Sequence, residues 1–432
     1  MKYSIYNTIL HVDGKHTIIY NAFKDNFVVI KNITFSPEQC SIEEIKLEFP
    51  KLYDQFCKGG ILVDSSIDEF ELLQEKVRQC DDNHNEFILH INPTLDCNFS
   101  CWYCYENHIV NSKMSEEALE FIKLFITRKL SNPEIETFEL GFFGGEPLFY
   151  FDKIAKKILL HSAAICERNN KILNIHFTSN GALLNEEIIE FLSKFNCAFQ
   201  ITLDGGREHH DITRYFKNKK GSYDIIINNV KLLLKKGISV ILRVNYTKDN
   251  IESVMNIFNE LISLTDKDKQ LLKIDFQRVW QDRVEEKDSA ELRITEIRKI
   301  FRKNGFFILA NYLPHNVEGS CYGDKKNHLL INYDGNVFGC TARDFTEANK
   351  IGKIDSNGEI CFDSEKIRIR DNSKLSKPVC RSCRIAPICG GGCKQRAVED
   401  RDNEECTMRY TESQIDEIVM DIFEHSFLPL NQ

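Results

Sequence analysis

Three cysteines lie close enough in the sequence to share one small metal centre. Cys97, Cys101 and Cys104 occur in the segment Asp-Cys-Asn-Phe-Ser-Cys-Trp-Tyr-Cys-Tyr, at the end of the strand-like run 89–95. Four thiolates saturate a structural zinc ion or an iron-sulfur cube, whereas three leave one metal open to an exogenous ligand. The alternative is a zinc knuckle, which needs a nearby fourth ligand, and His108 is the close candidate. The spacing favours a reactive metal site.

The pattern CxxxCxxC, with the aromatic Tyr103 before its last cysteine, resembles the signature of the radical S-adenosylmethionine (SAM) superfamily. The resemblance implies a [4Fe-4S] cluster whose bare iron is chelated by the amino and carboxylate groups of SAM. It also implies that reductive cleavage of SAM yields a 5′-deoxyadenosyl radical, which abstracts a hydrogen atom. Such a radical requires a site that excludes solvent and positions the target C–H bond.

A second cysteine pattern lies near the C-terminus. Its members are Cys321, Cys340, Cys380, Cys383, Cys389, Cys393 and Cys406. The spacing of these residues, with Gly335 before the second of them, resembles the SPASM domain of radical SAM enzymes. The resemblance covers residues 321–406 and implies two auxiliary [4Fe-4S] clusters, hence three clusters in the chain. Zinc is the alternative for the Cx2C portion.

The family's ligand pairing leaves one auxiliary cluster incomplete. It implies Cys380, Cys383, Cys389 and Cys406 for one cluster, and Cys321, Cys340 and Cys393 for the other. Residues 307–320 contain no further cysteine, and His315 is a candidate substitute. An open iron would bind and deprotonate a substrate thiolate, which favours cysteine-containing substrates. The competing expectation is an electron relay completed by an unidentified protein ligand.

Glycine-rich and polar segments follow the next strand-like runs. Gly144, Gly145 and Glu146, followed by Pro147, match the family segment that binds the SAM amino group, so the resemblance implies that role for them. Ser179 and Asn180 lie in Thr-Ser-Asn-Gly, a cluster suited to a ribose or carboxylate, for which the alternative is a strand-ending turn.

Two later segments supply the remaining candidate SAM contacts. Asp204, in Thr-Leu-Asp-Gly, precedes His209, His210, Asp211 and Arg214, a stretch that resembles the maturase branch of the family and implies that Asp204 shapes the pocket. Arg243 and Asn245 share one face of a predicted strand. Arg243 is a candidate to grip the SAM carboxylate, and an ion pair with a strand carboxylate is the alternative. Gln277 is a weaker lining candidate.

The elements that position these loops alternate between strands and helices, which predicts an α/β fold with a buried parallel sheet. Strands are expected at 88–95, 137–143, 172–179, 197–204, 239–246 and 272–277. Helices are expected at 115–130, 151–168, 186–195, 222–236 and 250–263. Six βα units predict a partial, TIM-like (β/α)6 barrel with its chemistry at the C-terminal strand ends. The three-cysteine loop follows the first strand, where such a site would lie.

Residues 1–85 predict a small separate module. The dipeptide Asp13-Gly14 favours a type I′ hairpin turn. Two capping boxes are expected to open helices: Ser41-x-x-Glu44 and Ser66-x-x-Glu69. The order of elements suggests a winged helix and resembles the recognition element of enzymes that modify ribosomal peptides, which implies that a leader peptide adds a strand to a sheet edge. A structural β/α cap on the barrel is the alternative.

We therefore expect three domains: a winged-helix-like recognition element (1–85), a radical SAM partial barrel (86–305) and a SPASM domain ending in a helix (306–432). The last helix, at 411–424, carries an apolar stripe that is expected to pack against a domain: Ile415, Ile418, Val419 and Ile422.

Composition limits the partners and the compartment. The net charge of -9 lacks a basic block, so a nucleic-acid partner is not expected. No apolar run is long enough for a membrane span, and the N-terminus lacks an export signal, so we expect a cytoplasmic protein. Cysteines in a reducing compartment favour metal ligation over disulfides. Six of the 16 cysteines are expected to be ordinary buried thiols: Cys40, Cys57, Cys80, Cys166, Cys197 and Cys361.

The leading hypothesis is a peptide maturase that forms a thioether or carbon-carbon crosslink in a ribosomally synthesised precursor. Its partners would be that precursor with its leader and a flavodoxin- or ferredoxin-type electron donor. The alternatives are a sulfatase-type maturase that oxidises Cys or Ser to formylglycine, a peptide epimerase, and a non-catalytic metal-binding scaffold.

Overall fold

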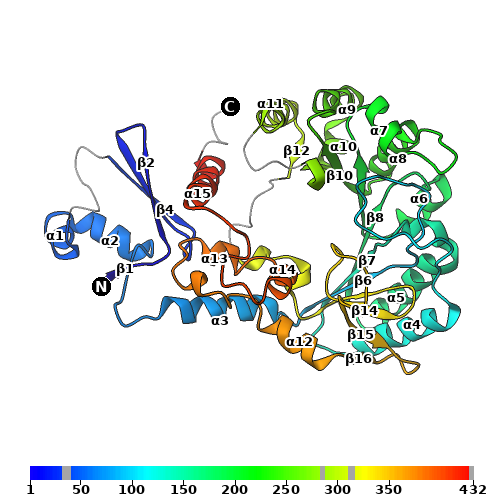
Figure 1. Ribbon diagram of the computed structural model, residues 1–432, viewed down its shortest axis with the longest axis horizontal. Helices are drawn as coiled ribbons and strands as arrows, with labels where there is room; N and C mark the ends of the chain where they lie inside the picture. The colour runs from blue at the N-terminus through cyan, green and yellow to red at the C-terminus, as the bar shows by residue number, and fades with distance from the viewer. Residues whose placement is uncertain (32–39, 283–287, 310–316, 428–432) are drawn as a thin grey trace. The chain divides into compact units, whose positions relative to one another are not determined.

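The computed structural model describes residues 1–31, 40–282, 288–309 and 317–427 (Figure 1). The chain folds into two compact units. The first comprises the described parts of residues 1–83, 312–326 and 364–432, and the second those of 84–311 and 327–363. The segment 306–432, expected from the sequence as one SPASM domain, contributes to both units. No helix in the described part of the chain combines the length and apolar character that a transmembrane span requires.

A mostly parallel sheet forms the centre of the second unit. Its six consecutive parallel strands are β6 (Glu86–Ile91), β7 (Thr137–Phe142), β8 (Ile172–Ser179), β9 (Cys197–Leu203), β10 (Ser239–Tyr246) and β11 (Leu272–Arg278). Beyond β11 the sheet adds β12 (Phe307–Ile308), and beyond β6 it adds β13 (His328–Ile331), β14 (Asn336–Phe338), β15 (Lys350–Ile354) and β16 (Ile360–Phe362). The six strands predicted from the sequence are confirmed.

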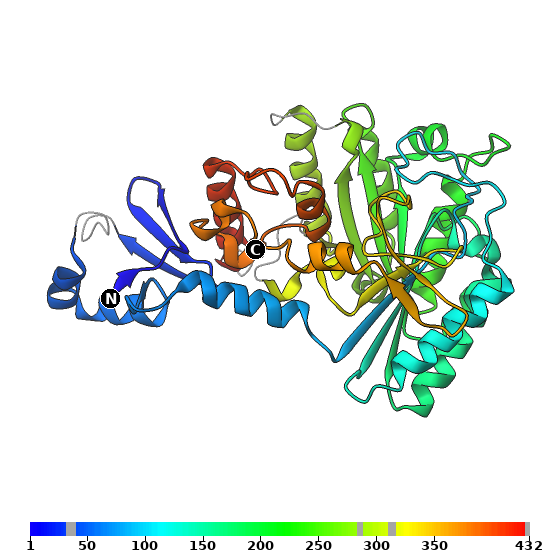
Figure 2. The same ribbon diagram turned by 60° about the horizontal axis from the view of Figure 1, so that its bottom comes forward.

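Helices cover the outer face of this sheet, as Figures 1 and 2 show. They are α4 (Glu116–Leu130), α5 (Lys156–Arg168), α6 (Glu186–Leu192), α7 (Arg207–Thr213), α8 (Tyr223–Lys235), α9 (Val254–Leu261), α10 (Asp266–Leu271) and α11 (Ser289–Lys303). Ser115 and Asn185 cap α4 and α6 through their side chains. Three short helices precede two of these elements: η1 (Pro147–Tyr150) and the π-helical η2 (Phe151–Ala155) lead into α5, and η3 (Ile251–Ser253) leads into α9.

Alternate strand residues build the core between sheet and helices. Neighbouring strands stack phenylalanines on the helix-facing side, with ring centroids of Phe142, Phe177 and Phe199 at 4.7 and 5.1 Å. The other face of the same strands carries polar side chains such as His90 and His176, because strand side chains alternate between the two faces. The first strand ends at Ile91, before the predicted limit of 95.

The first unit begins with a three-stranded antiparallel sheet, β2 (Asn7–Val12), β3 (His16–Asn21) and β4 (Asn26–Lys31), and a small pair of strands, β1 (Lys2–Tyr3) and β5 (Leu62–Val63). Asp13 and Gly14 both have positive φ, as the predicted type I′ turn between β2 and β3 requires. Its helices are α1 (Ile42–Glu48), α2 (Pro50–Lys58) and α3 (Glu69–Asp81). The capping box of Ser41 and Glu44 on α1 is confirmed.

The second predicted capping box is wrong. Helix α3 begins at Glu69, and its cap is Asp68, whose carboxylate accepts the N–H groups of Phe70 and Glu71. A carboxylate at this position both satisfies free N–H groups and complements the helix dipole. The Ser66 hydroxyl instead donates to Asp64.

The remainder of the first unit is rich in cysteine and short helices. These are η5 (Val317–Gly319), η6 (Tyr322–Asp324), α12 (Ser364–Asp371), η7 (Pro378–Arg381), α13 (Ala386–Cys389), α14 (Lys394–Glu399) and α15 (Glu412–Phe427). Helix α15 buries Ile415, Val419 and Ile422 in a core shared with β2, β3 and α3, so the predicted apolar stripe is confirmed. Cys361 was expected to be buried but is exposed, because it lies on the edge strand β16. Cys166 and Cys197 are buried as expected.

Candidate functional site

The loop that carries Cys97, Cys101 and Cys104 is held by a buried aspartate. The Asp96 carboxylate accepts the N–H groups of Cys97 and Asn111, each at 2.8 Å, and pairs with Lys217 Nζ at 3.0 Å. Burial acts to raise the pKa of Asp96, but the bonds from Asn111 and Lys217 outweigh it and keep the pKa below its ordinary value. The aspartate before the first cysteine therefore fixes the loop as an anion.

Cys101 lies near enough to both Cys97 and Cys104 for its charge to raise the pKa of each. Cys97 is buried, Cys101 is half-buried and Cys104 is exposed. The Cys104 N–H donates to the Cys101 carbonyl at 3.2 Å, which closes the loop between them. Burial raises the pKa of Cys97 to about 12, with a further contribution from the neighbouring charges of Glu146 and Cys101. A bound metal would stabilise the thiolates that this environment disfavours.

A buried polar cluster joins the cysteine loop to two strand ends. The Tyr103 hydroxyl donates to the Asp204 carboxylate at 2.6 Å and accepts from Arg214 at 2.8 Å and Asn245 at 3.1 Å. Burial raises the pKa of Cys101 and that of Asp204 above their ordinary values, and the adjacent Arg214 cation offsets part of each rise. The arrangement supplies positive charge beside the thiols and brings together four residues that the sequence analysis named separately.

Glu146 connects the next two predicted loops. Its carboxylate is fully buried and accepts the Ser179 hydroxyl at 2.7 Å, the Asn180 N–H at 2.8 Å and the Leu148 N–H at 3.1 Å. The Asn180 side-chain amide in turn donates to Asn98 at 2.8 Å, inside the cysteine loop. The acidic group is thus a positioning anion that joins the ends of β7 and β8 to the cysteine loop.

The glycines before Glu146 permit close contact between backbones. A Cβ on Gly145 would lie 2.3 Å from the Asp96 carbonyl oxygen, and one on Gly144, whose φ is +88°, would lie 2.6 Å from the Thr94 carbonyl oxygen. Glu146 N–H donates to that same Asp96 carbonyl at 2.9 Å. These contacts alone account for glycine at both positions, and the SAM contact implied by the resemblance stays a prediction.

Arg243 forms the ion pair that was the alternative to SAM binding. It contacts Asp275 on the neighbouring strand at 3.0 Å, and Gln277 donates to the other Asp275 oxygen at 2.7 Å. The Arg243 side chain keeps 38% of its surface exposed, so its guanidinium is not consumed by this pair. Its contact with the SAM carboxylate stays a prediction.

The buried histidine of the maturase-like stretch has a structural place. His210 Nδ1 accepts the Asp204 N–H at 3.2 Å, and its Nε2 lies 2.9 Å from the Ser222 hydroxyl. His210 therefore supports the backbone of Asp204. Sequence reasoning did not assign Lys217 to the site, because it reaches the cysteine loop only through the tertiary fold, nor Asn98, whose role inside that loop depends on its bond with Asn180.

Glu106, two residues beyond the last cysteine of the loop, is another site residue that sequence reasoning missed. Burial raises its pKa to about 8, and the charges of Asp344 and Glu146 add to the shift. A carboxyl that holds its proton near neutral pH is unusual at an ordinary surface.

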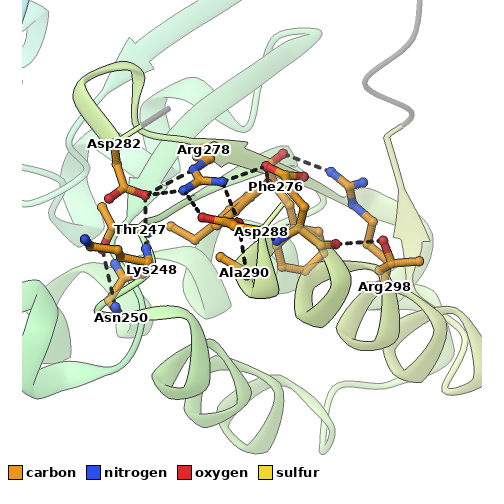
Figure 3. Close-up of polar contacts among 12 residues, drawn as sticks. Thr247, Lys248, Asn250, Phe276, Arg278, Asp282, Asp288, Ala290 and Arg298 are labelled. Atoms are coloured by element: carbon orange, nitrogen blue, oxygen red, sulfur yellow. Dashed lines mark hydrogen bonds and ion pairs between the residues drawn. The ribbon is translucent and has the colours of Figure 1, made fainter. Parts of the chain in front are cut away.

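Arg278, the last residue of β11, forms an ion cluster that fixes the turn after this strand (Figure 3). Arg278 pairs with Asp282 at 3.0 Å and with Asp288 at 2.7 Å, and the bonded arginine lowers the pKa of Asp288 to about 2. This holds the turn η4 (Trp280–Asp282), whose Gln281 amide donates to the Tyr103 carbonyl at 3.2 Å. The first and sixth strand ends are thereby linked.

Four cysteines of the C-terminal pattern lie close together in the first unit. Burial raises the pKa of Cys389 to about 12 and that of Cys380 to about 11, and mutual charges among Cys380, Cys383, Cys389 and Cys406 add to both shifts. This is the set that the resemblance implies for one auxiliary cluster, and as a donor set it fits a [4Fe-4S] cube.

The other predicted auxiliary set stays a prediction. Cys321 is exposed and Cys393 is half-buried in the first unit, whereas Cys340 belongs to the second. His315 lies outside the described residues. Among the residues that the structure describes, no three His, Cys, Asp or Glu side chains are grouped tightly enough for a single metal ion. A four-iron cube holds its thiolates farther apart than one zinc ion with its 2.3 Å bonds, so this spacing does not oppose a cluster.

Comparisons with known proteins show which proteins this chain is similar to. Residues 91–261 match the family model described as Radical SAM superfamily. The cysteine-type anaerobic sulfatase-maturating enzyme of Clostridium novyi (strain NT) is 25% identical over 339 residues, which cover 69% of this chain and 85% of that enzyme. The radical SAM cyclopropyl synthase TigE of Paramaledivibacter caminithermalis is 24% identical over 208 residues, 43% of this chain and 42% of TigE.

Solved structures show the same fold. Native anSMEcpe with bound AdoMet aligns with a TM-score of 0.56 at 19% identity and covers 79% of this chain and 97% of its own. Streptococcus suis SuiB bound to S-adenosylmethionine aligns with a TM-score of 0.55 at 15% identity and covers 94% of this chain and 98% of its own. Both alignments extend well beyond the residues of the family model.

Proposed function

Because this chain is a radical SAM superfamily enzyme related to anaerobic sulfatase-maturating enzymes and SuiB-type maturases, we propose that it installs a thioether or carbon-carbon crosslink in a ribosomally synthesised precursor peptide. The family relation sets aside the non-catalytic scaffold.

In this proposal Cys97, Cys101 and Cys104 hold the SAM-binding [4Fe-4S] cluster. The bound cluster and SAM supply a 5′-deoxyadenosyl radical that abstracts hydrogen from the substrate. Tyr103, Gly144, Gly145, Glu146, Ser179, Asn180, Asp204 and Arg243 line or support the SAM pocket. Their interlocked bonds leave little freedom to the strand-end loops, which suits a site that must keep a reactive species away from water.

The first unit supplies the observation that carries the proposal: a folded N-terminal sheet with helices stands before the barrel. Two SuiB structures, one of which is bound to its precursor peptide SuiA, align with 94% and 91% of this chain. Alignments of this extent reach into the N-terminal region. We assign this module to the winged-helix-like recognition element expected at residues 1–85. A leader peptide would add a strand at β4, since β2 packs against α15 at the other edge.

The edge strand β4 has the surface that strand addition needs. Val29 is 50% exposed there, while Ile30 points into the core. An added strand would satisfy the backbone groups of β4 and cover the apolar side chain. Residues 32–39, which follow, lie outside the described chain.

The cysteine-rich segment is proposed to be a SPASM domain with two auxiliary [4Fe-4S] clusters. One is held by Cys380, Cys383, Cys389 and Cys406. The other is held by Cys321, Cys340 and Cys393, with its fourth iron position open to a substrate thiolate or closed by an unidentified ligand. A thiolate held there would be deprotonated and ready to form a C–S bond.

A second candidate function is oxidation of Cys or Ser to formylglycine in a protein substrate. The relation to the Clostridium novyi sulfatase-maturating enzyme, over 69% of this chain, favours it. The first unit discriminates the two, because a folded-protein motif needs no leader-binding sheet. Epimerisation of the peptide is a third outcome, which leaves the peptide mass unchanged.

The test is an anaerobic incubation of the reconstituted enzyme with SAM, a reductant and the precursor peptide encoded beside its gene. We expect deoxyadenosine and a peptide lighter by two hydrogens for each crosslink. The Cys101→Ala variant should produce neither product, whereas Cys361→Ala, which removes an exposed thiol outside both cysteine patterns, should match the wild type. SAM cleavage with an unchanged peptide mass would exclude the crosslink, and deuterium uptake from solvent would then identify epimerisation.

A further inference from the structure

One buried lysine of the first unit contacts the segments at both ends of the four-cysteine set, which comprises Cys380, Cys383, Cys389 and Cys406. Lys377 is only 4% exposed. Its carbonyl accepts the Cys380 N–H at 3.0 Å. Its ammonium donates to the carbonyl of Asp400 at 2.6 Å and to that of Asn403, in the segment that leads to Cys406. Lys377 therefore joins the segments that carry the first and the last cysteine of the set.

The charge of Lys377 is not balanced by a carboxylate. In the part of the chain that the structure describes, its ammonium forms no ion pair and bonds to main-chain carbonyls. Carbonyl oxygens satisfy its N–H donors but carry no net charge. The Lys374 side chain, by contrast, is 5% exposed and pairs with Asp81 at 3.3 Å and with Asp324 at 3.4 Å. Because a buried charge needs an opposite charge nearby, Lys377 suits a neighbouring anion that is not a side-chain carboxylate.

The thiols of the set can supply such an anion. Burial raises the pKa of Cys380 to about 11, and the charge of Lys377 opposes that rise. Burial also raises the pKa of Cys383, where hydrogen bonds from the N–H groups of Ile385 and Ala386 oppose the rise. The surroundings therefore favour negative charge on sulfur. An iron-sulfur cube held by four thiolates is an anion, and it gains one further negative charge on reduction.

Thr407, directly after Cys406, adds a hydrogen-bond donor to the same surroundings. It is 4% exposed, and its hydroxyl has no partner among the residues that the structure describes. The Thr407 Cβ lies 3.6 Å from the position that a Cβ on Gly392 would take, so Thr407 packs against the loop between Cys389 and Cys393. A buried hydroxyl without a partner is destabilising, and a sulfur of a cube at these cysteines would accept its hydrogen bond.

We propose that Lys377 is the counter-ion of the auxiliary cluster in the four-cysteine set and raises the reduction potential of that cluster, with the Thr407 hydroxyl as a donor to one of its sulfurs. A fixed positive charge favours the reduced cluster, because reduction adds negative charge. Hydrogen bonds to the sulfurs act in the same direction. Lys377 is a positioning residue in this role, since it acts through the cluster and not on the substrate.

The inference rests on the proposed function for the presence of this cluster, but its potential is measured without turnover. The cluster-loaded, full-length protein is reduced stepwise with redox mediators, and electron paramagnetic resonance (EPR) follows the reduced clusters. The signal that Cys389→Ala lacks identifies the cluster of this set. In Lys377→Met we expect the ratio of reduced to oxidised cluster at a fixed potential to fall about tenfold, a midpoint shift of about 59 mV to more negative potential for one electron. Thr407→Val should shift the midpoint in the same direction by less.

The matched control is Arg381→Met. Arg381 directly follows Cys380, but it is exposed, with its guanidinium carbon 4.9 Å from the centroid of the Phe70 ring. The control removes the same charge as Lys377→Met, from a position where water and salt screen it. Its midpoint potential should therefore stay close to that of the wild type. Lys377→Arg keeps the buried charge and should also stay close to the wild type.

The possible outcomes have distinct meanings. Equal midpoint potentials in Lys377→Met and Arg381→Met would overturn the counter-ion. If Lys377→Met loses about four irons, retention of iron in Lys377→Arg supports the role of the charge, whereas loss from both variants would assign Lys377 a purely structural contact and overturn the proposal. Persistence of every wild-type EPR signal in Cys389→Ala would overturn it together with the cluster. A wild type that forms no deoxyadenosine with dithionite would contradict the proposed function, and the titration would still decide the role of Lys377.

Discussion

A single buried carboxylate carries much of the order in the candidate site. The Glu146 carboxylate accepts hydrogen bonds from the Ser179 hydroxyl and from the N–H groups of Asn180 and Leu148. Burial raises its pKa, whereas the bonds from Asn180 and Ser179 lower it. A neutral amide in place of this anion would bring N–H donors of its own. These donors would face the hydroxyl and N–H donors that now bond to the carboxylate.

We therefore expect Glu146→Gln to weaken SAM binding by at least about tenfold, because charge-assisted bonds of about 1.5–3 kcal/mol each are lost from the loop junction. Ser179→Ala removes one donor and should cost about 1 kcal/mol of stability, with a smaller effect on SAM affinity. Equilibrium dialysis of cluster-loaded protein with labelled SAM measures the SAM affinity, and the variants and the wild type are compared at matched iron content. Equal affinity in Glu146→Gln and wild type would show that the junction does not support the SAM pocket.

At the scale of single residues, the sequence predicted the motifs whose members lie close together in the chain. The three cysteines, the glycines and the strand-end polar residues could be found because each motif is local. The cluster of Tyr103, Asp204, Arg214 and Asn245 could not be assembled, because its members are up to 142 residues apart. The ion pair of Arg243 with Asp275 was one of two readings, since a strand pattern gives the face of a side chain but not its partner.

Among the elements, the strands place histidines side by side on the inner face of the sheet. His90 on β6 and His176 on β8 are both in register with Gly141 on β7, where a Cβ would lie 2.5 Å from the His90 ring. His90 Nδ1 lies 3.0 Å from His328 Nε2 on β13. One of these two nitrogens must donate and the other accept, so protonating both rings would break the bond.

Burial lowers the pKa of His90 to about 3 and that of His176 to about 4. The unfolded chain takes up protons near pH 6.5, but the folded chain does not until far lower pH, so folding stability is lost as the pH falls below about 6.5. Each histidine should contribute a loss of about 1 kcal/mol between pH 7.5 and 5.5.

In His176→Gln this part of the pH dependence should disappear, even if the variant is less stable at every pH. Thermal or urea unfolding of matched samples at both pH values measures the difference. His84→Gln, at an exposed position before β6, serves as the control and should keep the wild-type dependence. A wild-type dependence in His176→Gln would contradict the assignment.

The strands were predictable from the sequence because their burial alternates or runs continuously over six to eight residues. The four-residue β13 was not, since it is short and pairs in parallel with β6, some 240 residues earlier in the chain. Boundaries also shifted where polar residues intervene. Strand β6 stops at Ile91 because Asn92 turns to Asn332 and Pro93 has no N–H for the ladder.

On the scale of the whole molecule, the C-terminal third serves both units. Strands β13–β16 extend the large sheet, whereas residues 364–427 share a core with the N-terminal sheet and α3. The four mutually close cysteines belong to this second group, and buried ion pairs of Lys374 with Asp81 and Asp324 tie their surroundings to α3. Their cluster would therefore be built into the unit that carries the proposed leader-binding sheet.

Three [4Fe-4S] clusters would give about twelve irons per chain. We expect Cys389→Ala, which removes one member of the four-cysteine set, to lose about four irons and to destabilise the first unit. SAM cleavage with dithionite should persist, since Cys97, Cys101 and Cys104 belong to the other unit. Cys361→Ala, at an exposed thiol on β16, should keep its full iron content. Iron and sulfide analysis with Mössbauer spectroscopy measures both variants, and an unchanged iron content in Cys389→Ala would show that these four thiols hold no cluster.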